Sequence, residues 1–239
     1  MWNYDFKVPE NKKIRLIVHT DCKNEADDQY ALAHHLMTPK FEVKGIVAGH
    51  FWKNPQEYGE LGTAKASYEE VIKIMDLMGL KDEYPVFLGA PRGLEDEQTP
   101  IESEGAKFII EEALKDDNRP LYIACQGAVT DVAAALLLKP EIAEKIVVIW
   151  IGGADYPEGG FEFNLAMDIA AANVIFASQA EVWQIFIRRI SGNESESRES
   201  KYPVATRRTM GTWRSGNRGS SHGRIRESKL QDDRSTAHC

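Results

Sequence analysis

Four carboxylate residues stand within eight positions near the start of the 239-residue chain. They are Asp21, Glu25, Asp27 and Asp28. Like charges this close repel one another and raise each other's pKa unless a cation neutralises them. Hard divalent cations take oxygen ligands, and carboxylates in a tight loop are a common source of them. The cluster therefore predicts a site for a divalent cation, with a solvated acidic turn at a helix start as the alternative.

The spacing of this cluster excludes two other loops and leaves two other functions open. It lacks the glycine and ligand spacing of an EF-hand, and it has no Gly-x-x-x-x-Gly-Lys run. A Mg²⁺-dependent phosphatase of the haloacid dehalogenase type also places an Asp after its first strand. Such an enzyme would have a second Asp two residues after Asp21, where Lys23 stands. That phosphatase and a non-catalytic metal-binding or sugar-binding protein are two functions that stay open.

Short apolar runs and helical patterns alternate along residues 1–187, which predicts one α/β domain. The predicted strands are residues 14–19, 41–48, 85–89, 121–125 and 146–151. The predicted helices are residues 27–37, 63–78, 104–114, 129–138 and 168–178. Strands separated by helices of this length predict right-handed crossovers and a mostly parallel, Rossmann-like sheet with helices on both faces. Ligands of such sheets bind beyond the carboxyl ends of the strands, where the acidic cluster lies.

The chain divides into two parts of opposite charge. Residues 1–187 hold 31 Asp and Glu against 17 Lys and Arg, a net charge of -14. Residues 188–239 hold 6 against 12, a net charge of +6. This second part is rich in Arg and Ser, and its few large apolar residues show no period. We therefore predict an irregular tail that is disordered or non-native in origin.

Charge, cysteines and hydropathy limit the partners and the location. A net charge of -8 argues against general nucleic-acid binding. The longest apolar stretch, residues 146–152, is far too short to cross a bilayer, and the polar start shows no signal peptide. Three widely spaced cysteines form neither a disulfide framework nor a zinc site, which favours a reducing, cytoplasmic location. Cys125 is expected to be a small buried residue.

Three segments share their motifs and their order with one known family. The first is Asp21-x-x-Asn24-Glu25-x-Asp27-Asp28, directly after an apolar strand. The second is Gly127-Ala-Val-Thr130-Asp131, followed by Pro140-Glu-Ile. The third is Gly152-Gly153, followed by Glu162-Phe163-Asn164 and Asp168-x-x-Ala171-Ala172. Together they resemble the nucleoside hydrolases, the calcium-dependent inosine-uridine preferring N-ribohydrolases, and the Asn-Glu insertion resembles a divergent branch.

The resemblance implies hydrolysis of the N-glycosidic bond of a ribonucleoside or a related ribosyl compound. By similarity, Asp21 and Asp28 would bind Ca²⁺ through their carboxylates, and Thr130 through its backbone carbonyl. Asp21 would also be the general base on a metal-bound water. Six further residues would bind the small-molecule substrate: Asp27, Asn24, Glu25, His50, Glu162 and Asn164. Their carboxylates would stabilise positive charge on the sugar ring. A homo-oligomer is compatible with the same resemblance.

The chain departs from the family after Trp183-Gln184-Ile185, where the resemblance is expected to stop. Family members are longer, and their C-terminal part supplies a further Asp ligand and often a His that protonates the leaving base. Asp232, Asp233 and His238 lie in the tail without a matching motif, so no role is transferred to them. The sequence therefore predicts an incomplete domain whose hydrolysis is impaired. Asp168 is expected to cap the helix that follows it rather than to bind metal.

Overall fold

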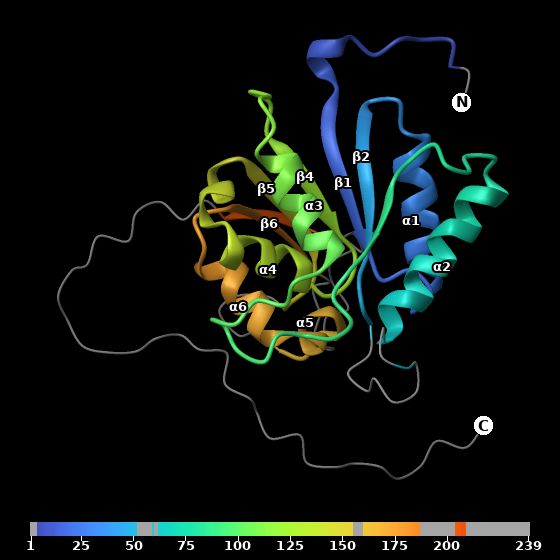
Figure 1. The fold of residues 1–239 in the computed structure, drawn as a ribbon. Helices are drawn as coiled ribbons and strands as arrows, with labels where there is room; N and C mark the ends of the chain where they lie inside the picture. The colour runs from blue at the N-terminus through green and yellow to red at the C-terminus, as the bar shows by residue number, and fades with distance from the viewer. Residues whose placement is uncertain (1–3, 52–58, 60–61, 155–159, 187–203, 209–239) are drawn as a thin grey trace, which may run out of the picture.

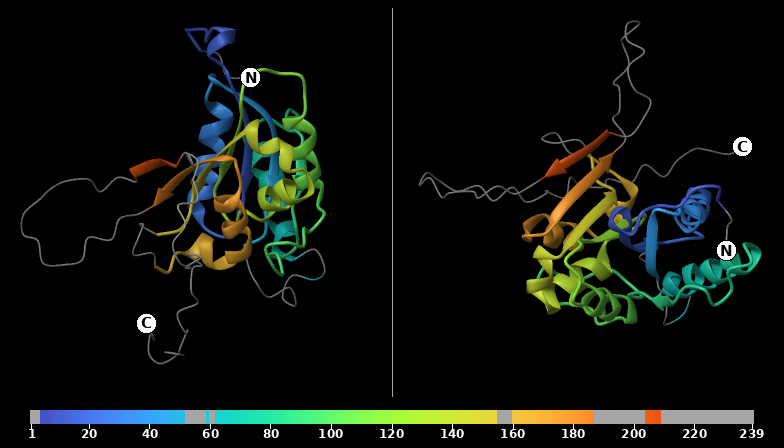
Figure 2. Two further views of the ribbon diagram at one scale, coloured as in Figure 1. Left: turned by 90° about the vertical axis from the view of Figure 1, so that its left-hand side faces the viewer. Right: turned by 90° about the horizontal axis from the view of Figure 1, so that it is seen from above.

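The computed structural model describes residues 4–51, 59, 62–154, 160–186 and 204–208. In these residues the strands form one sheet in the order β3-β2-β1-β4-β5-β6-β7 (Figure 1). The strands are β1 (Ile14–Thr20), β2 (Phe41–Ala48), β3 (Val86–Leu88), β4 (Leu121–Cys125), β5 (Ile146–Ile151), β6 (Glu181–Phe186) and β7 (Val204–Arg208). Strands β1 to β6 run parallel, and β7 pairs antiparallel to β6 at the outer edge of the sheet (Figure 2).

Helices cover both faces of this sheet. They are α1 (Ala26–Met37), α2 (Gly62–Leu77), α3 (Glu104–Ala113), α4 (Thr130–Leu138), α5 (Phe163–Met167) and α6 (Ile169–Ala177). Two short 3₁₀ turns, Glu10–Lys12 and Pro140–Glu144, precede β1 and β5. Helices α1 and α2 share one core cluster with Leu16 and Val18 of β1. Ile17 points the other way and packs in the cluster that contains α3, α4 and α6. Alternate residues of β1 are therefore buried on opposite faces, as a central parallel strand requires.

The predicted α/β fold is confirmed, and the boundaries of its elements are close to the predicted ones. Strands β2, β4 and β5 have the predicted bounds, and the other predicted elements differ by one residue at either end. Besides the two 3₁₀ turns, three elements were not predicted: β6, the short helix α5, and β7. Residues 204–208 belong to the predicted irregular tail, yet they extend the sheet as β7. The rest of that tail lies outside the described residues, so its disordered or non-native character stays a prediction.

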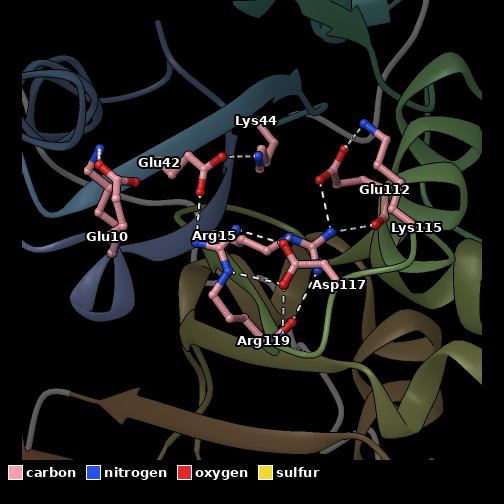
Figure 3. Close-up of polar contacts among 9 residues, drawn as sticks. Glu10, Arg15, Glu42, Lys44, Glu112, Lys115, Asp117 and Arg119 are labelled. Carbon is pink, nitrogen blue, oxygen red and sulfur yellow. Dashed lines mark hydrogen bonds and ion pairs between the residues drawn. The ribbon is translucent and has the colours of Figure 1, made fainter.

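A network of ion pairs ties the amino ends of the strands together (Figure 3). The guanidinium of Arg15 in β1 is 2% exposed, and its Nη2 lies 2.9 Å from Oε1 of Glu112, the residue before the end of α3. Arg119, just before β4, pairs with Glu42 of β2 and with Asp117. These contacts fix the strand starts at the edge opposite the acidic cluster. Of the described helices, none combines the length and the apolar character that crossing a membrane needs.

Candidate functional site

The acidic cluster lies at the carboxyl edge of the sheet, the lower edge in Figure 1. Asp21 follows β1 directly, and Gly49 and His50 follow β2. Gln126 and Gly127 follow β4, and the backbone N–H of Gln126 donates to the carbonyl of His19 at 2.9 Å. The parallel register of β1 with β2 and β4 brings these loops side by side. The topology therefore places the predicted site where ligands of parallel sheets bind.

Asp21 is buried with one carboxylate oxygen unused. The side chain is 1% exposed, and Asn24 Nδ2 donates to its Oδ2 at 3.1 Å. Its Oδ1 is buried and has no hydrogen-bond partner in the described part of the chain. Burial raises the pKa of Asp21 to about 6, against the lowering effect of hydrogen bonds from the backbone and from Asn24. An unpaired, buried carboxylate oxygen is costly unless a ligand satisfies it.

Asp28 is the second buried carboxylate of the cluster. It lies in the first turn of α1, is 7% exposed, and accepts a long hydrogen bond of 3.4 Å from Thr20 Oγ1. Burial raises its pKa to about 8, and repulsion from Asp21 and Asp27 adds to the rise. Two neighbouring carboxylates that resist ionisation are the condition that a bound cation relieves.

The donor set fits a hard divalent cation. Asp21 supplies an unsatisfied buried oxygen, and the carboxylate of Asp28 interacts with that of Asp21. No group of three His, Cys, Asp or Glu side chains in the described ranges could hold a metal ion unaided. Ca²⁺ also accepts neutral oxygens from backbone carbonyls and water. The predicted carbonyl ligand Thr130 belongs to that class.

Thr130 begins α4, and its hydroxyl connects two loops. It donates to Asp168 Oδ2 at 2.6 Å, so it accepts from His50 Nε2, 2.8 Å away. Asp168 caps α6 by accepting from the amide of Ala171, as predicted, and it also accepts from Leu94. His50, predicted as a substrate residue, is 1% exposed and is thereby joined to Thr130. The hydroxyl of Thr130 is thus used in these two bonds, and a metal contact through its carbonyl stays a prediction.

The exposed residues of the cluster have different surroundings. Glu25 precedes α1 without capping it through its side chain, and both Glu25 and Asp27 are exposed. The amide of Asn24 binds Asp21, so this predicted substrate residue also orients the predicted base. Lys23 has a φ of 97°, in the region that favours glycine, and its Nζ pairs with Glu70 of α2. A strained non-glycine residue inside a candidate site is typical of functional loops.

Glu162 and Asn164 organise the loop after β5. The Glu162 carboxylate accepts from the amides of Asn164 and Leu165 as the cap of α5, and from Gly153 at 2.7 Å. Asn164 Nδ2 donates to the carbonyls of Gln126 and Ile151, both at 2.8 Å. These bonds hold α5 against the ends of β4 and β5. A contact of either side chain with a sugar stays a prediction.

Three polar residues with buried side-chain atoms at this edge received no role from the sequence. His19 of β1 and Asp131 of α4 contact each other through Nε2 and Oδ2 at 2.9 Å. Gln126 has both side-chain amide atoms buried without a hydrogen-bond partner in the described residues. A histidine inside an otherwise apolar strand was the available signal for His19. Cys125 is buried as predicted, and burial raises its pKa.

The inosine-uridine preferring nucleoside hydrolase family model matches residues 16–214. The chain belongs to this family. The match continues beyond Ile185, where the resemblance was expected to stop, and includes β7, so that predicted limit was too early. The acidic cluster of this nucleoside hydrolase family member lies within the matched residues. The residues outside the match are few: residues 1–15 and 215–239.

Curated relatives and solved structures agree with this assignment. The pyrimidine-specific ribonucleoside hydrolase RihA of Salmonella dublin is 27% identical, with 66% of this chain and 56% of the relative covered. The chain thus spans about half the length of the curated relatives it matches. A purine-preferring ribonucleoside hydrolase from Gardnerella vaginalis shares the fold at a TM-score of 0.59 and 23% identity, covering 72% of this chain and 60% of that one. An inosine-uridine preferring nucleoside hydrolase from Bacillus anthracis shares the fold at a TM-score of 0.55 and 19% identity, covering 73% of this chain and 65% of that one.

Proposed function

We propose that this chain hydrolyses the N-glycosidic bond of a ribonucleoside or a related ribosyl compound at the carboxyl edge of the sheet, with Ca²⁺ as cofactor. The observation that carries the proposal is the buried Asp21–Asp28 pair, in which Asp21 Oδ1 has no partner among the described residues. Family membership supports the reaction class. A cytoplasmic location, inferred from cysteine usage, belongs to the same proposal.

Asp21 has the burial and position of a general base. Its Oδ1 would accept the proton of the attacking water, and Asn24 holds the opposite oxygen so that the carboxylate keeps its orientation. When bound, a divalent cation supplies positive charge that lowers the pKa of water and holds ribose hydroxyls in place.

The other carboxylates would act on the sugar. Asp27 lies next to Asp28 and is exposed, so it can reach a ribose hydroxyl without losing a bond. Bond cleavage develops positive charge on the ring, which carboxylates around it stabilise. Glu162 and Asn164 would contribute from the segment after β5, which their hydrogen bonds with Gly153 and Gln126 hold at this edge.

The test is the release of free ribose from a panel of purine and pyrimidine nucleosides, since relatives with either preference share this fold. Reactions are run with millimolar Ca²⁺ and with an excess of chelator, and phosphate release from sugar phosphates is measured in parallel. Ribose release that the chelator abolishes supports the proposal. Phosphate release without ribose release would replace it with the phosphatase. Calcium binding with neither product would leave a non-catalytic binding protein.

A further inference from the structure

His19 and Asp131 form a fully buried polar pair beside the candidate metal site. Their side chains are 1% and 0% exposed, and His19 Nε2 lies 2.9 Å from Asp131 Oδ2. The two residues are 112 positions apart in the sequence, on β1 and α4. Burial favours the neutral form of Asp131, but the hydrogen bonds from His19, Ser103 and Ala90 together bring its pKa below the ordinary value. The Asp131 carboxylate therefore accepts the hydrogen bond between the two side chains, and His19 Nε2 donates it.

The carboxylate of Asp131 is held from three directions. Besides His19, it accepts from Ser103 Oγ at 2.5 Å and from the amide of Ala90 at 2.9 Å. Ser103 is the N-cap of α3, and Ala90 lies in the loop after β3. Asp131 thus joins the ends of β1 and β3 to the starts of α3 and α4. Four elements that meet at the carboxyl edge share this one carboxylate.

Glycines leave the space that the pair occupies. A Cβ atom at Gly49 would lie 2.7 Å from His19 Cε1, and one at Gly89 would lie 2.6 Å from Asp131 Oδ2. Both distances are too short for any side chain larger than hydrogen. Because a buried charged group adds little stability over apolar packing, such an arrangement is better explained by the geometry it fixes.

The sequence neighbours of the pair are the candidate metal ligands. His19 precedes Asp21 by two residues at the end of β1, and Asp131 directly follows Thr130 at the start of α4. The ligands come from separate elements, so their spacing depends on how β1 and α4 are held together. Besides the pair, a backbone hydrogen bond of 2.9 Å from the Gln126 N–H to the His19 carbonyl ties the end of β1 to the loop before α4.

We propose that the buried His19–Asp131 pair is a positioning pair that sets the distance between Asp21 and Thr130. The inference rests on the proposed function, because it takes these two residues as Ca²⁺ ligands. Residues that do not bind the metal but orient its ligands typically change metal affinity by about 10–100-fold when they are removed. The described hydrogen bonds of the pair go to other residues than Asp21, and His19 also favours the charged form of Asp21 electrostatically.

The test is Ca²⁺ affinity measured by calorimetry on the full chain. Asp131→Leu removes the polar contacts at similar size, and His19→Met removes the donor from the other side. Asp131→Asn keeps the shape and acceptors for Ser103 and Ala90, so it should retain most of the affinity. The matched control is Glu112→Met, which breaks a buried pair at the opposite edge of the sheet (Figure 3). Thermal unfolding of every variant separates lost stability from lost binding.

The expected result is Ca²⁺ binding weakened about 10–100-fold by Asp131→Leu or His19→Met. Glu112→Met should lower the melting temperature and leave Ca²⁺ affinity unchanged. If a folded Asp131→Leu or His19→Met variant binds Ca²⁺ like the wild type, the positioning role is wrong while the metal site stands. An equal loss of affinity in Glu112→Met would also overturn it, since the effect would then follow general stability. A wild-type chain that binds no Ca²⁺ would overturn the proposed function, and this inference with it.

Discussion

Substituting Gly127 by alanine should displace the carboxylate of Asp21. The added Cβ would lie 2.3 Å from Asp21 Cγ and 2.4 Å from its Oδ1. The shortest ordinary contact of a Cβ atom is 3.4 Å, so the distance between this Cβ and Asp21 Cγ must grow by roughly 1.1 Å, from 2.3 to 3.4 Å. Gly127 cannot easily retreat, because its carbonyl accepts from Nε1 of the fully buried Trp150 at 2.9 Å. The movement therefore falls on Asp21.

The magnitude follows from what that displacement does. Calcium–oxygen distances lie between about 2.3 and 2.6 Å, so a shift of roughly 1 Å removes a ligand from its place. A misplacement of this size commonly costs about 100-fold in rate. The stability cost of an extra methyl group in a packed site is about 1–3 kcal/mol. Gly127 does not have a positive φ, so the backbone itself accepts alanine without strain.

The assay compares ribose release, Ca²⁺ affinity and thermal unfolding in Gly127→Ala and in a matched control. Gly45→Ala serves as the control, because its Cβ would lie 2.7 Å from Phe108 Cζ in the core. Both variants should lose stability, and Gly127→Ala alone should lose Ca²⁺ binding and activity. Unchanged Ca²⁺ affinity in Gly127→Ala would refute the placement of the metal at Asp21.

Three further outcomes are expected. Because Asp21 and Asp28 have pKa values of about 6 and about 8 in the folded chain against 3.8 ordinarily, metal-free stability should fall as the pH rises from about 4 to 8. The gain in melting temperature from millimolar Ca²⁺ should then be larger at pH 8 than at pH 5.5, and an equal gain would contradict this. Arg15→Met should lower the free energy of unfolding by about 3–5 kcal/mol in a denaturant titration, because Glu112 keeps a buried charge without its partner. Trypsin should cut first after arginines beyond position 208 and leave the sheet intact, whereas resistance there equal to that of the sheet would contradict the predicted tail.

The fold could be predicted because its signals are local. The strand from Ile14 and the helix from Ala26 follow from an apolar run and from apolar residues at helical spacing. Strand β6 contains the polar residues Glu181 and Gln184, so its apolar run is interrupted, and the change of composition nearby obscured it. Strand β7 holds two arginines and is a strand because β6 offers it an unpaired edge. Such pairing depends on tertiary context and leaves little trace in local sequence.

From residue types and spacing alone, the candidate site could be predicted only where its members are close in sequence; Thr130, His50, Glu162 and Asn164 came from the family resemblance. Asp21 and Asp28 stand seven positions apart in a cluster of four carboxylates, and the number of carboxylates alone indicates a cation site. The contacts of Thr130 with His50 and Asp168 join three distant segments, and no local pattern announces them. The same holds for His19 and Asp131, whose side chains meet through the arrangement of β1 against α4. Glu162 was expected to bind the substrate, and only the structure shows that it caps α5.

The central claim, that Asp21 is both a Ca²⁺ ligand and the base of a ribohydrolase, is tested most directly by one comparison. The rate of ribose release is measured for the wild type and for Asp21→Asn at saturating Ca²⁺, with the nucleoside that the panel identifies as the best substrate. Asp21→Asn keeps the size of the side chain and removes the charge and the proton acceptor. We expect a loss of at least about 100-fold together with weaker Ca²⁺ binding. A variant that releases ribose at the wild-type rate would contradict the account.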